Sequence, residues 1–116
     1  MNWIIGRQLI LENINVGDYI DPNNPNRIII ATPTKEHSEF RVQIGAATNI
    51  SISLEMLEAI LKATIANKGI YNKSVIYQLY PRMVNNHGCH VHVVGRLFSV
   101  AGVMQPIGTR NYTIVN

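Results

Sequence analysis

Four side chains able to donate or accept hydrogen bonds recur at spacings of three, four and three near the end of the chain. They are Cys89, His92, Arg96 and Ser99. On a helix these spacings place all four on one face. The opposite stripe is apolar and consists of Val91, Val94, Phe98 and Ala101, with Leu97 beside it. We therefore predict a helix over Cys89–Ala101 that is anchored by its apolar stripe and presents donors on its other side.

This polar stripe has the chemistry of base and phosphate recognition. The Arg96 guanidinium can bond guanine O6 and N7 together, His92 a base edge or a phosphate, and Ser99 either. Any surface helix has a polar side, so the stripe alone does not decide the interpretation. What favours recognition of a polyanion is that no aspartate or glutamate occurs from Ala59 to Asn116.

Charge is distributed unevenly along the chain. Residues 1–50 contain five acids and four bases, and the formal net charge of the whole chain is +3. The second half carries three histidines, His87, His90 and His92, and six cations: Lys62, Lys68, Lys73, Arg82, Arg96 and Arg110. An acid-free, basic half indicates a nucleic-acid partner more directly than the mean charge does.

Further phosphate contacts are expected from three other segments. Lys73 and Ser74 open a short helix, where backbone N–H groups favour anions. Arg82 and Asn86 lie in the segment between that helix and the next one. Arg110 lies at a hairpin tip, from which an arginine can contact the backbone or enter the minor groove.

The elements of residues 51–116 follow from helical spacing and from end signals. Ser51 or Ser53 can cap an amphipathic helix from Leu54 to about Asn67, which Lys68-Gly69 ends. Asn72 can then cap a short helix, which Pro81 stops. The expected order after the first helix is: helix Lys73–Leu79, loop Tyr80–Gly88, helix Cys89–Ala101 ended by Gly102, and hairpin Met104–Val115.

Residues 1–50 are expected to form a small antiparallel sheet. Period-two alternation over Phe40–Gly45 and β-branched runs elsewhere favour short strands separated by turns. The predicted strands are Trp3–Ile10, Gly17–Ile20, Arg27–Thr32 and Phe40–Gly45, with the Asp21–Asn26 loop and the Pro33–Glu39 loop between them.

The order helix, short helix, longer helix and hairpin, over about residues 52–115, resembles the winged helix-turn-helix superfamily. The stretch Leu97–Val115 (LFSVAGVMQPIGTRNYTIV) carries most of the likeness: a helix that closes on a small residue and glycine, then a hairpin with a basic tip. The resemblance implies a recognition helix in the DNA major groove and a hairpin that serves as a wing. One departure is the Tyr80–Gly88 segment, which is longer than a tight helix-turn-helix uses.

Two enzymatic alternatives have partial patterns. His90 and His92 alternate as two zinc ligands on a strand would, and GCHVHVVGR is superficially similar to the motif of histidine-triad hydrolases, with Val94 in the third position. On a helix, however, residues two apart diverge by about 200°, so His90 and His92 could not bind one metal ion together. Asp21 with Glu39-Phe40-Arg41 is faintly similar to the carboxylates of restriction-type nucleases.

The sequence thus predicts an α+β protein: an N-terminal β subdomain, residues 1–50, packed on a C-terminal winged helix-turn-helix, residues 51–116. The expected partner is double-stranded DNA, with no cofactor, no metal and no catalytic residue. We expect the module to act as a free-standing regulator or as the recognition part of a larger restriction-type enzyme. The sequence does not determine whether it forms a homodimer. A winged helix that binds protein is the alternative, which exposed Val93 or Met104 beside Arg96 would favour. A single cysteine suits a reducing cytoplasm, and no membrane segment is expected.

Overall fold

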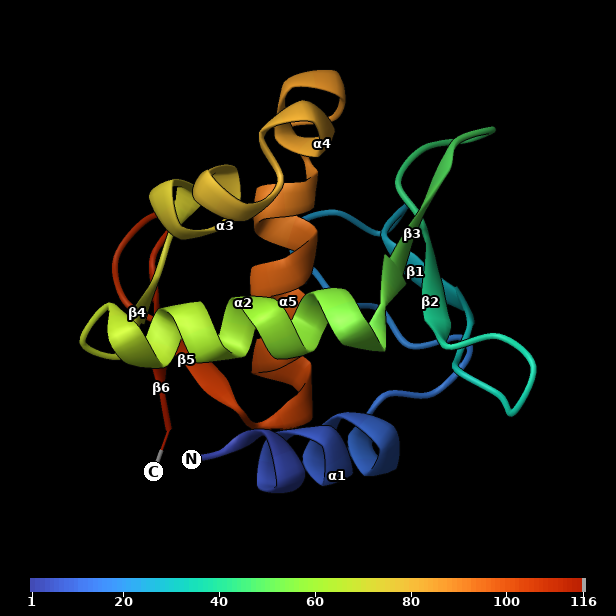
Figure 1. Ribbon diagram of the computed structural model, residues 1–116. Helices are drawn as coiled ribbons and strands as arrows, with labels where there is room; N and C mark the ends of the chain where they lie inside the picture. Colours follow the sequence, from blue (N-terminus) through green and yellow to red (C-terminus); the bar gives the residue numbers. More distant parts are fainter. Residues whose placement is uncertain (116) are drawn as a thin grey trace.

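In the computed structural model, which describes residues 1–115, one helix runs through the middle of an α+β fold (Figure 1). This helix, α5 (His90–Ala101), buries eight of its residues. Four further helices and two small antiparallel sheets surround it in the described part of the chain. The apolar stripe predicted for this segment is therefore the central surface of the core, which includes Val94, Leu97 and Phe98.

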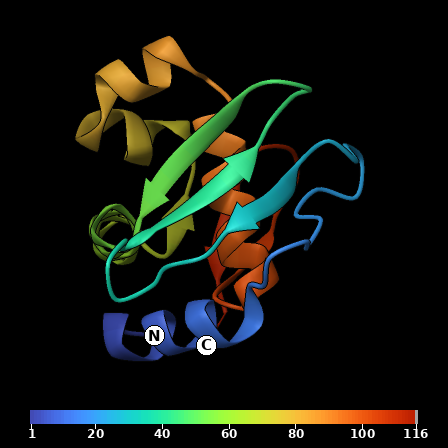
Figure 2. The same cartoon turned by 90° about the vertical axis from the view of Figure 1, so that its right-hand side faces the viewer.

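The N-terminal half consists of one helix and one three-stranded antiparallel sheet. The elements are α1 (Trp3–Asn13), β1 (Ile28–Ala31), β2 (Glu39–Gln43) and β3 (Asn49–Ser53), and the sheet order is β1-β2-β3. This sheet lies beside α5, with α1 below both (Figure 2). Buried side chains pair across it, Phe40 with Ile52 and Val42 with Ile50, so its inner face is fixed against the core.

The predicted strand at Trp3–Ile10 is wrong, because this segment belongs to α1. The side chain of Asn2 accepts a hydrogen bond from the Ile5 N–H (2.9 Å) and so caps the helix. Gly6 and Ile10, four residues apart, form the buried side of α1. A Cβ atom at Gly6 would lie only 2.8 Å from Leu61 Cδ2, so the glycine allows close packing on α2. Capping and packing thus outweigh the strand preference of the apolar run.

Two further expectations for the first half are corrected. Gly17–Ile20 is not a strand, since only an isolated bridge joins Tyr19 to Ile28. Conversely, β3 was not predicted, although its buried Ile50 and Ile52 alternate with partly exposed serines. Ser53 ends this strand and caps the next helix, accepting a hydrogen bond from the Met56 N–H (3.0 Å). The predicted strands over β1 and β2 are confirmed.

The second half follows the predicted order more closely. Its elements are α2 (Leu54–Ala66), β4 (Ile70–Tyr71), α3 (Lys73–Leu79), α4 (Pro81–Asn86), α5, β5 (Met104–Pro106) and β6 (Tyr112–Ile114). Asn72 caps α3 as expected, since its side chain accepts from the Val75 N–H (3.3 Å). Gly102 ends α5 in the left-handed conformation, with φ 83°. The hairpin β5–β6 gains β4 as a third strand, in the order β4-β6-β5.

The predicted loop at Tyr80–Gly88 is corrected, because it contains α4. Pro81 does end α3, but it also occupies the first turn of α4, where a missing N–H costs nothing. Val84 is the buried residue of this short helix. The linkage between α3 and α5 is therefore a structured element with its own anchor in the core.

Both halves contribute to the same hydrophobic core. Its buried members include Ile10 and Phe40 from the first half and Leu61 and Phe98 from the second.

Within residues 1–115 there is no helix long and apolar enough to cross a membrane.

Gly95 on α5 packs closely against the Tyr112 ring on β6. A Cβ atom at Gly95 would lie 2.2 Å from Tyr112 Cε1, well inside van der Waals contact. Tyr112 is 2% exposed and its ring centroid lies 5.9 Å from that of Tyr71. The Tyr71 hydroxyl in turn donates to the Val91 carbonyl (2.7 Å). Gly95 lowers the helical propensity of α5, but its lack of a side chain allows the Tyr112 ring of the hairpin to pack on the helix.

We predict that Gly95→Ala destabilises the protein. Alanine favours a helix by about 1 kcal/mol over glycine, but forcing a methyl group into a packed core costs about 1–3 kcal/mol. Because the buried ring has little room to move, we expect steric repulsion to win, with a net loss of about 1–2 kcal/mol in urea unfolding.

Gly88→Ala is the matched control. Its added methyl group would meet the Val84 carbonyl at an ordinary 3.8 Å, so a change within about 0.5 kcal/mol is expected. Equal stability of Gly95→Ala and wild type would contradict the packing argument.

Candidate functional site

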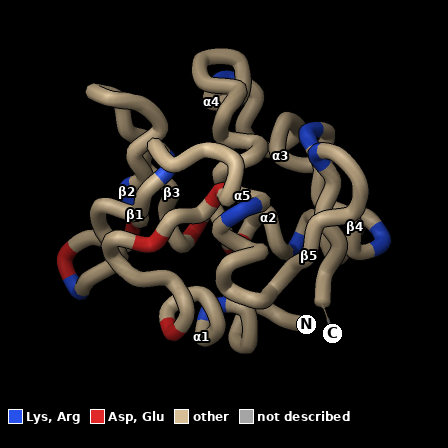
Figure 3. Tube along the Cα trace, turned by 180° about the vertical axis from the view of Figure 1, so that it is seen from behind, with Lys and Arg blue, Asp and Glu red and all other residues tan. Residues whose placement is uncertain are grey.

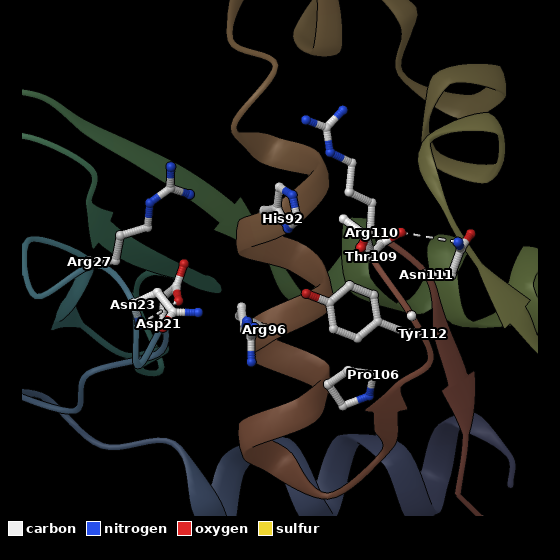
Figure 4. Close-up of a pocket in the computed structure, with 11 residues that line it drawn as sticks. Asp21, Asn23, Arg27, His92, Arg96, Pro106, Thr109, Arg110, Asn111 and Tyr112 are labelled. Carbon is white, nitrogen blue, oxygen red and sulfur yellow. Dashed lines mark hydrogen bonds between the residues drawn. The ribbon is translucent and has the colours of Figure 1, made fainter.

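Two adjoining cavities lie along the side of α5 that the core leaves uncovered, and together they form what we call the α5 groove. The first encloses about 330 Å³ between the loop that follows Ile20 and the β5–β6 hairpin (Figure 4). The second encloses about 760 Å³ beside the starts of α3 and α5. Four residues border both cavities and make them one continuous surface: Arg27, His92, Arg110 and Asn111.

Three segments far apart in the sequence form the floor and the two sides of this groove. His92 and Arg96, one turn apart on α5, form the floor. On one side lies the loop between Ile20 and β1, with Asp21 and Arg27; on the other lies the hairpin tip with Arg110 (Figure 4). The Tyr112 hydroxyl points toward α5 from the hairpin side. The groove is thus an open channel with α5 recessed at its base.

Five of the eight sequence-predicted site residues border the α5 groove. Lys73, Ser74, His92, Arg96 and Arg110 line one or both cavities. Three do not border it: Arg82, Asn86 and Ser99. The first two lie on α4, from which Val84 and Asn85 border the groove instead. Ser99 lies one turn beyond Arg96, half-buried near the α1 end of α5.

The N-terminal half supplies residues that the sequence analysis did not place among the DNA contacts, although it weighed Asp21 as a nuclease carboxylate. Asp21, Asn23 and Arg27 line the groove opposite the hairpin. The helices, loop and hairpin predicted to contact DNA contain no acid. The groove nevertheless includes one, because the N-terminal half contributes Asp21. Apart from a cation at the end of an exposed Pro/Asn-rich loop, the sequence holds no signal that this loop would lie against α5.

The basic side chains of the groove have few internal partners. Arg27 Nε and Nη1 and Arg96 Nε are buried without a hydrogen-bond partner among the described residues. The ion pairs found in residues 1–115 lie elsewhere, Glu39 with Arg41 (3.9 Å) and Glu58 with Lys62 (2.6 Å). From behind, the region of α3 and β4 carries only basic positions, while the acidic ones lie elsewhere on the molecule (Figure 3). Because cations outnumber acids in its lining and form no ion pair there among the described residues, the groove suits an anionic ligand.

The charges that line the groove shift the pKa of His92. Burial lowers the pKa of its imidazole, and the neighbouring cations Arg110, Arg27 and Arg96 lower it further, while Asp21 acts in the opposite direction. Burial also lowers the pKa of His90. His92 is therefore poised as a neutral hydrogen-bonding group that would gain a proton beside an anion.

The hairpin tip holds its cation in an unusual backbone conformation. Arg110 has φ 69° and Gly108 has φ 63°, both in the left-handed region. Glycine adopts this region freely, but a side chain such as arginine does so at a cost of about 1–2 kcal/mol. The Asn111 side chain donates to the Thr109 carbonyl (3.2 Å) and tightens the turn. A strained arginine at an exposed tip is a feature that function, more than stability, explains.

The histidine and carboxylate patterns considered for metal chemistry are not brought together. His90 is buried, and its Nδ1 donates to the His87 carbonyl (2.8 Å), whereas His92 borders the groove. Asp21 lines the groove, but Glu39 and Arg41 line a different cavity. Nowhere in the described chain do three histidine, cysteine, aspartate or glutamate side chains gather as metal ligands would.

No protein-family model, curated protein or solved structure matches this chain.

We predict that acidification from about pH 7.5 to 5.5 lowers the free energy of unfolding, and that His92 contributes to the loss. The folded-state pKa of His92 lies below the ordinary value of 6.5, so in this window the unfolded chain binds more protons than the folded one. The stability that His92 contributes is present above pH 6.5 and is lost as the pH falls toward its folded pKa.

Urea unfolding at several pH values checks this prediction. His92→Gln should flatten the dependence, while His37→Gln, an exposed histidine between β1 and β2, should keep the wild-type slope. A His92→Gln profile identical to wild type would contradict the assignment.

Proposed function

We propose that the protein binds double-stranded DNA, with the outer side of α5 directed at the major groove and the β5–β6 hairpin as a wing. The observation that carries the proposal is the convergence of unpaired basic side chains on one groove along α5. Arg27, Arg96 and Arg110 come from three separate segments, and Asp21 is the one acid that lines the groove among the described residues. A surface of this kind fits phosphates on both sides of a recognition helix.

The order of the elements also supports the proposal. Helix α2, the short helix α3, the longer helix α5 and then a hairpin occur along the chain in the order that the winged helix-turn-helix resemblance implies. Helix α4 is an insertion between the second and third of these helices. It lengthens the connection, and two of its residues, Val84 and Asn85, border the second cavity.

Each part of the groove then has a chemical task. The Arg96 guanidinium, whose Nε lacks an acceptor in the described protein, would donate to guanine O6 and N7. His92 would contact a base edge or a phosphate, and Lys73 and Ser74 would contact the backbone beside α3. Arg110 would reach the backbone or the minor groove from the hairpin tip. These tasks involve binding, and the proposal assigns no catalytic step.

The protein-binding alternative depended on exposed apolar residues beside Arg96. Val93 is fully buried and Met104 is 2% exposed, so neither is offered to a partner. The cavity between Asp21 and Arg110 is lined mainly by polar and charged residues. DNA is therefore the partner class that the groove favours.

We predict that wild-type protein binds duplex DNA with an affinity that falls steeply as salt rises, and that Arg96→Ala loses sequence preference. Counterion release makes phosphate contacts salt-dependent, and a lost bidentate guanine contact costs about 1–3 kcal/mol of discrimination. Selection from a random duplex library, followed by fluorescence anisotropy over a salt series, measures both effects.

Arg7→Ala is the matched control, because it removes the same charge from the exposed side of α1, outside the groove. It should keep the wild-type sequence preference. Salt-independent or absent binding by the wild type would refute the proposed function. Unchanged preference in Arg96→Ala would show that another face reads the bases.

We predict opposite effects of Arg110→Asn on stability and on binding. Asparagine tolerates the left-handed backbone better than arginine, so the free energy of unfolding should stay equal or rise by up to about 1 kcal/mol. Loss of the cation should weaken DNA binding and reduce the salt slope by about 1. Parallel unfolding and anisotropy measurements check the pair of effects, and lower stability with unchanged affinity would contradict it.

A further inference from the structure

We propose that the Asp21–Arg27 loop, here called the flanking loop, is a second DNA-contacting edge of the groove, with Arg27 on a backbone phosphate opposite the hairpin tip. This inference rests on the proposed function and assigns a role to the N-terminal half, which lies outside the winged-helix resemblance. The loop and the hairpin tip border the same cavity from its two sides, with α5 between them (Figure 4).

The flanking loop is held in shape by its own hydrogen bonds. The Ile20 N–H donates to the Arg27 carbonyl (3.1 Å), which closes the loop at its base. The Arg27 N–H donates to the Asn24 carbonyl (3.2 Å), and the Asp21 carboxylate accepts from the Asn23 N–H (2.9 Å). Ile20 and Ile29 are both buried on the chain at either side. Such a loop presents its side chains with little ordering cost on binding.

Arg27 has the hydrogen-bonding capacity that a phosphate would use. Its Nε and Nη1 are buried and find no acceptor among the described residues, although the side chain borders both cavities of the groove. A phosphate offers the paired oxygen acceptors that match the planar guanidinium fork. The loop side of the groove, where Arg27 lies, is therefore the place we assign to the phosphate.

The geometry favours a DNA strand over a single small anion. A helix lying in a major groove has one sugar-phosphate backbone on each side of it. The flanking loop and the hairpin tip lie on the two sides of α5, so Arg27 and Arg110 are positioned for different strands (Figure 4). The groove is also continuous past His92 into the second cavity, beyond the size of one phosphate group.

Asp21 gives the flanking loop a second function. Its carboxylate lies in the cavity with Arg27 and Arg96 but forms no ion pair with either in the described chain. A carboxylate repels phosphate and can accept a hydrogen bond from a base amino group such as cytosine N4. Asp21 would therefore keep the backbone away from the floor of the groove and reserve that position for a base edge.

The test compares Arg27→Gln with Arg41→Gln on a random-sequence duplex of about 20 bp, from roughly 50 to 200 mM salt. Arg41 lies exposed on β2, outside the groove, and its loss removes the same charge. We expect Arg27→Gln to reduce the salt slope by about 1 and Arg41→Gln to match wild type. Arg27→Lys should restore most of the slope, which separates the lost charge from altered folding.

A second arm tests the acid. Asp21→Asn keeps an oxygen acceptor for the Asn23 N–H and should tighten binding to random duplex, whereas Glu36→Gln, an exposed acid between β1 and β2, should leave it unchanged. If wild type and Arg96→Ala behave as proposed but Arg27→Gln keeps the wild-type slope, the flanking loop is not part of the interface and the proposed function stands. If wild type does not bind duplex, both proposals fail. Equal gains from Asp21→Asn and Glu36→Gln would reduce Asp21 to a contribution to net charge.

Discussion

The arrangement of this protein depends on the contact between the Tyr112 ring and Gly95. Because no side chain intervenes at Gly95, the Tyr112 ring of β6 packs directly on α5 and holds the β5–β6 hairpin beside the helix. This contact holds the hairpin tip, with Arg110, beside His92 and Arg96, which lie one turn apart on α5. Tyr71 extends the same packing to β4 through its ring and through its bond to Val91. The candidate site is thus a product of core packing, more than of any local motif.

How much of this the sequence could predict varies with how local the determining interaction is. Helices α2, α3 and α5 were predictable because their caps and apolar stripes lie within the segments themselves, as with Ser53 and Asn72. Helix α1 was not, because its identity depends on the Asn2 cap and on Gly6 meeting Leu61, a residue 55 positions away. Helix α4 was not predicted, because Pro81 is compatible both with the end of α3 and with the first turn of a new helix.

The same distinction applies to the candidate site. His92, Arg96 and Arg110 were found from helical spacing and hairpin chemistry, and all three border the groove. Arg27 and Asp21 were missed, since the pairing of β1 with β2 and the packing of that sheet beside α5 carry their loop to the groove. Charge counted along the chain made the site appear free of acid. In the folded protein Asp21 lies in the groove, and a ligand would encounter its charge there.

The recessed position of α5 has a mechanical consequence. Most of its side chains belong to the core, so the helix cannot move outward to meet a ligand without disturbing the packing of Leu97 and Phe98. If a duplex binds here as proposed, any adjustment of shape falls on the DNA, because the helix at the base of the groove is fixed. The energy of that deformation depends on base steps that no side chain touches, with flexible pyrimidine–purine steps favoured over stiff A-tracts. A rigid protein groove would in this way select DNA by its flexibility as well as by its sequence.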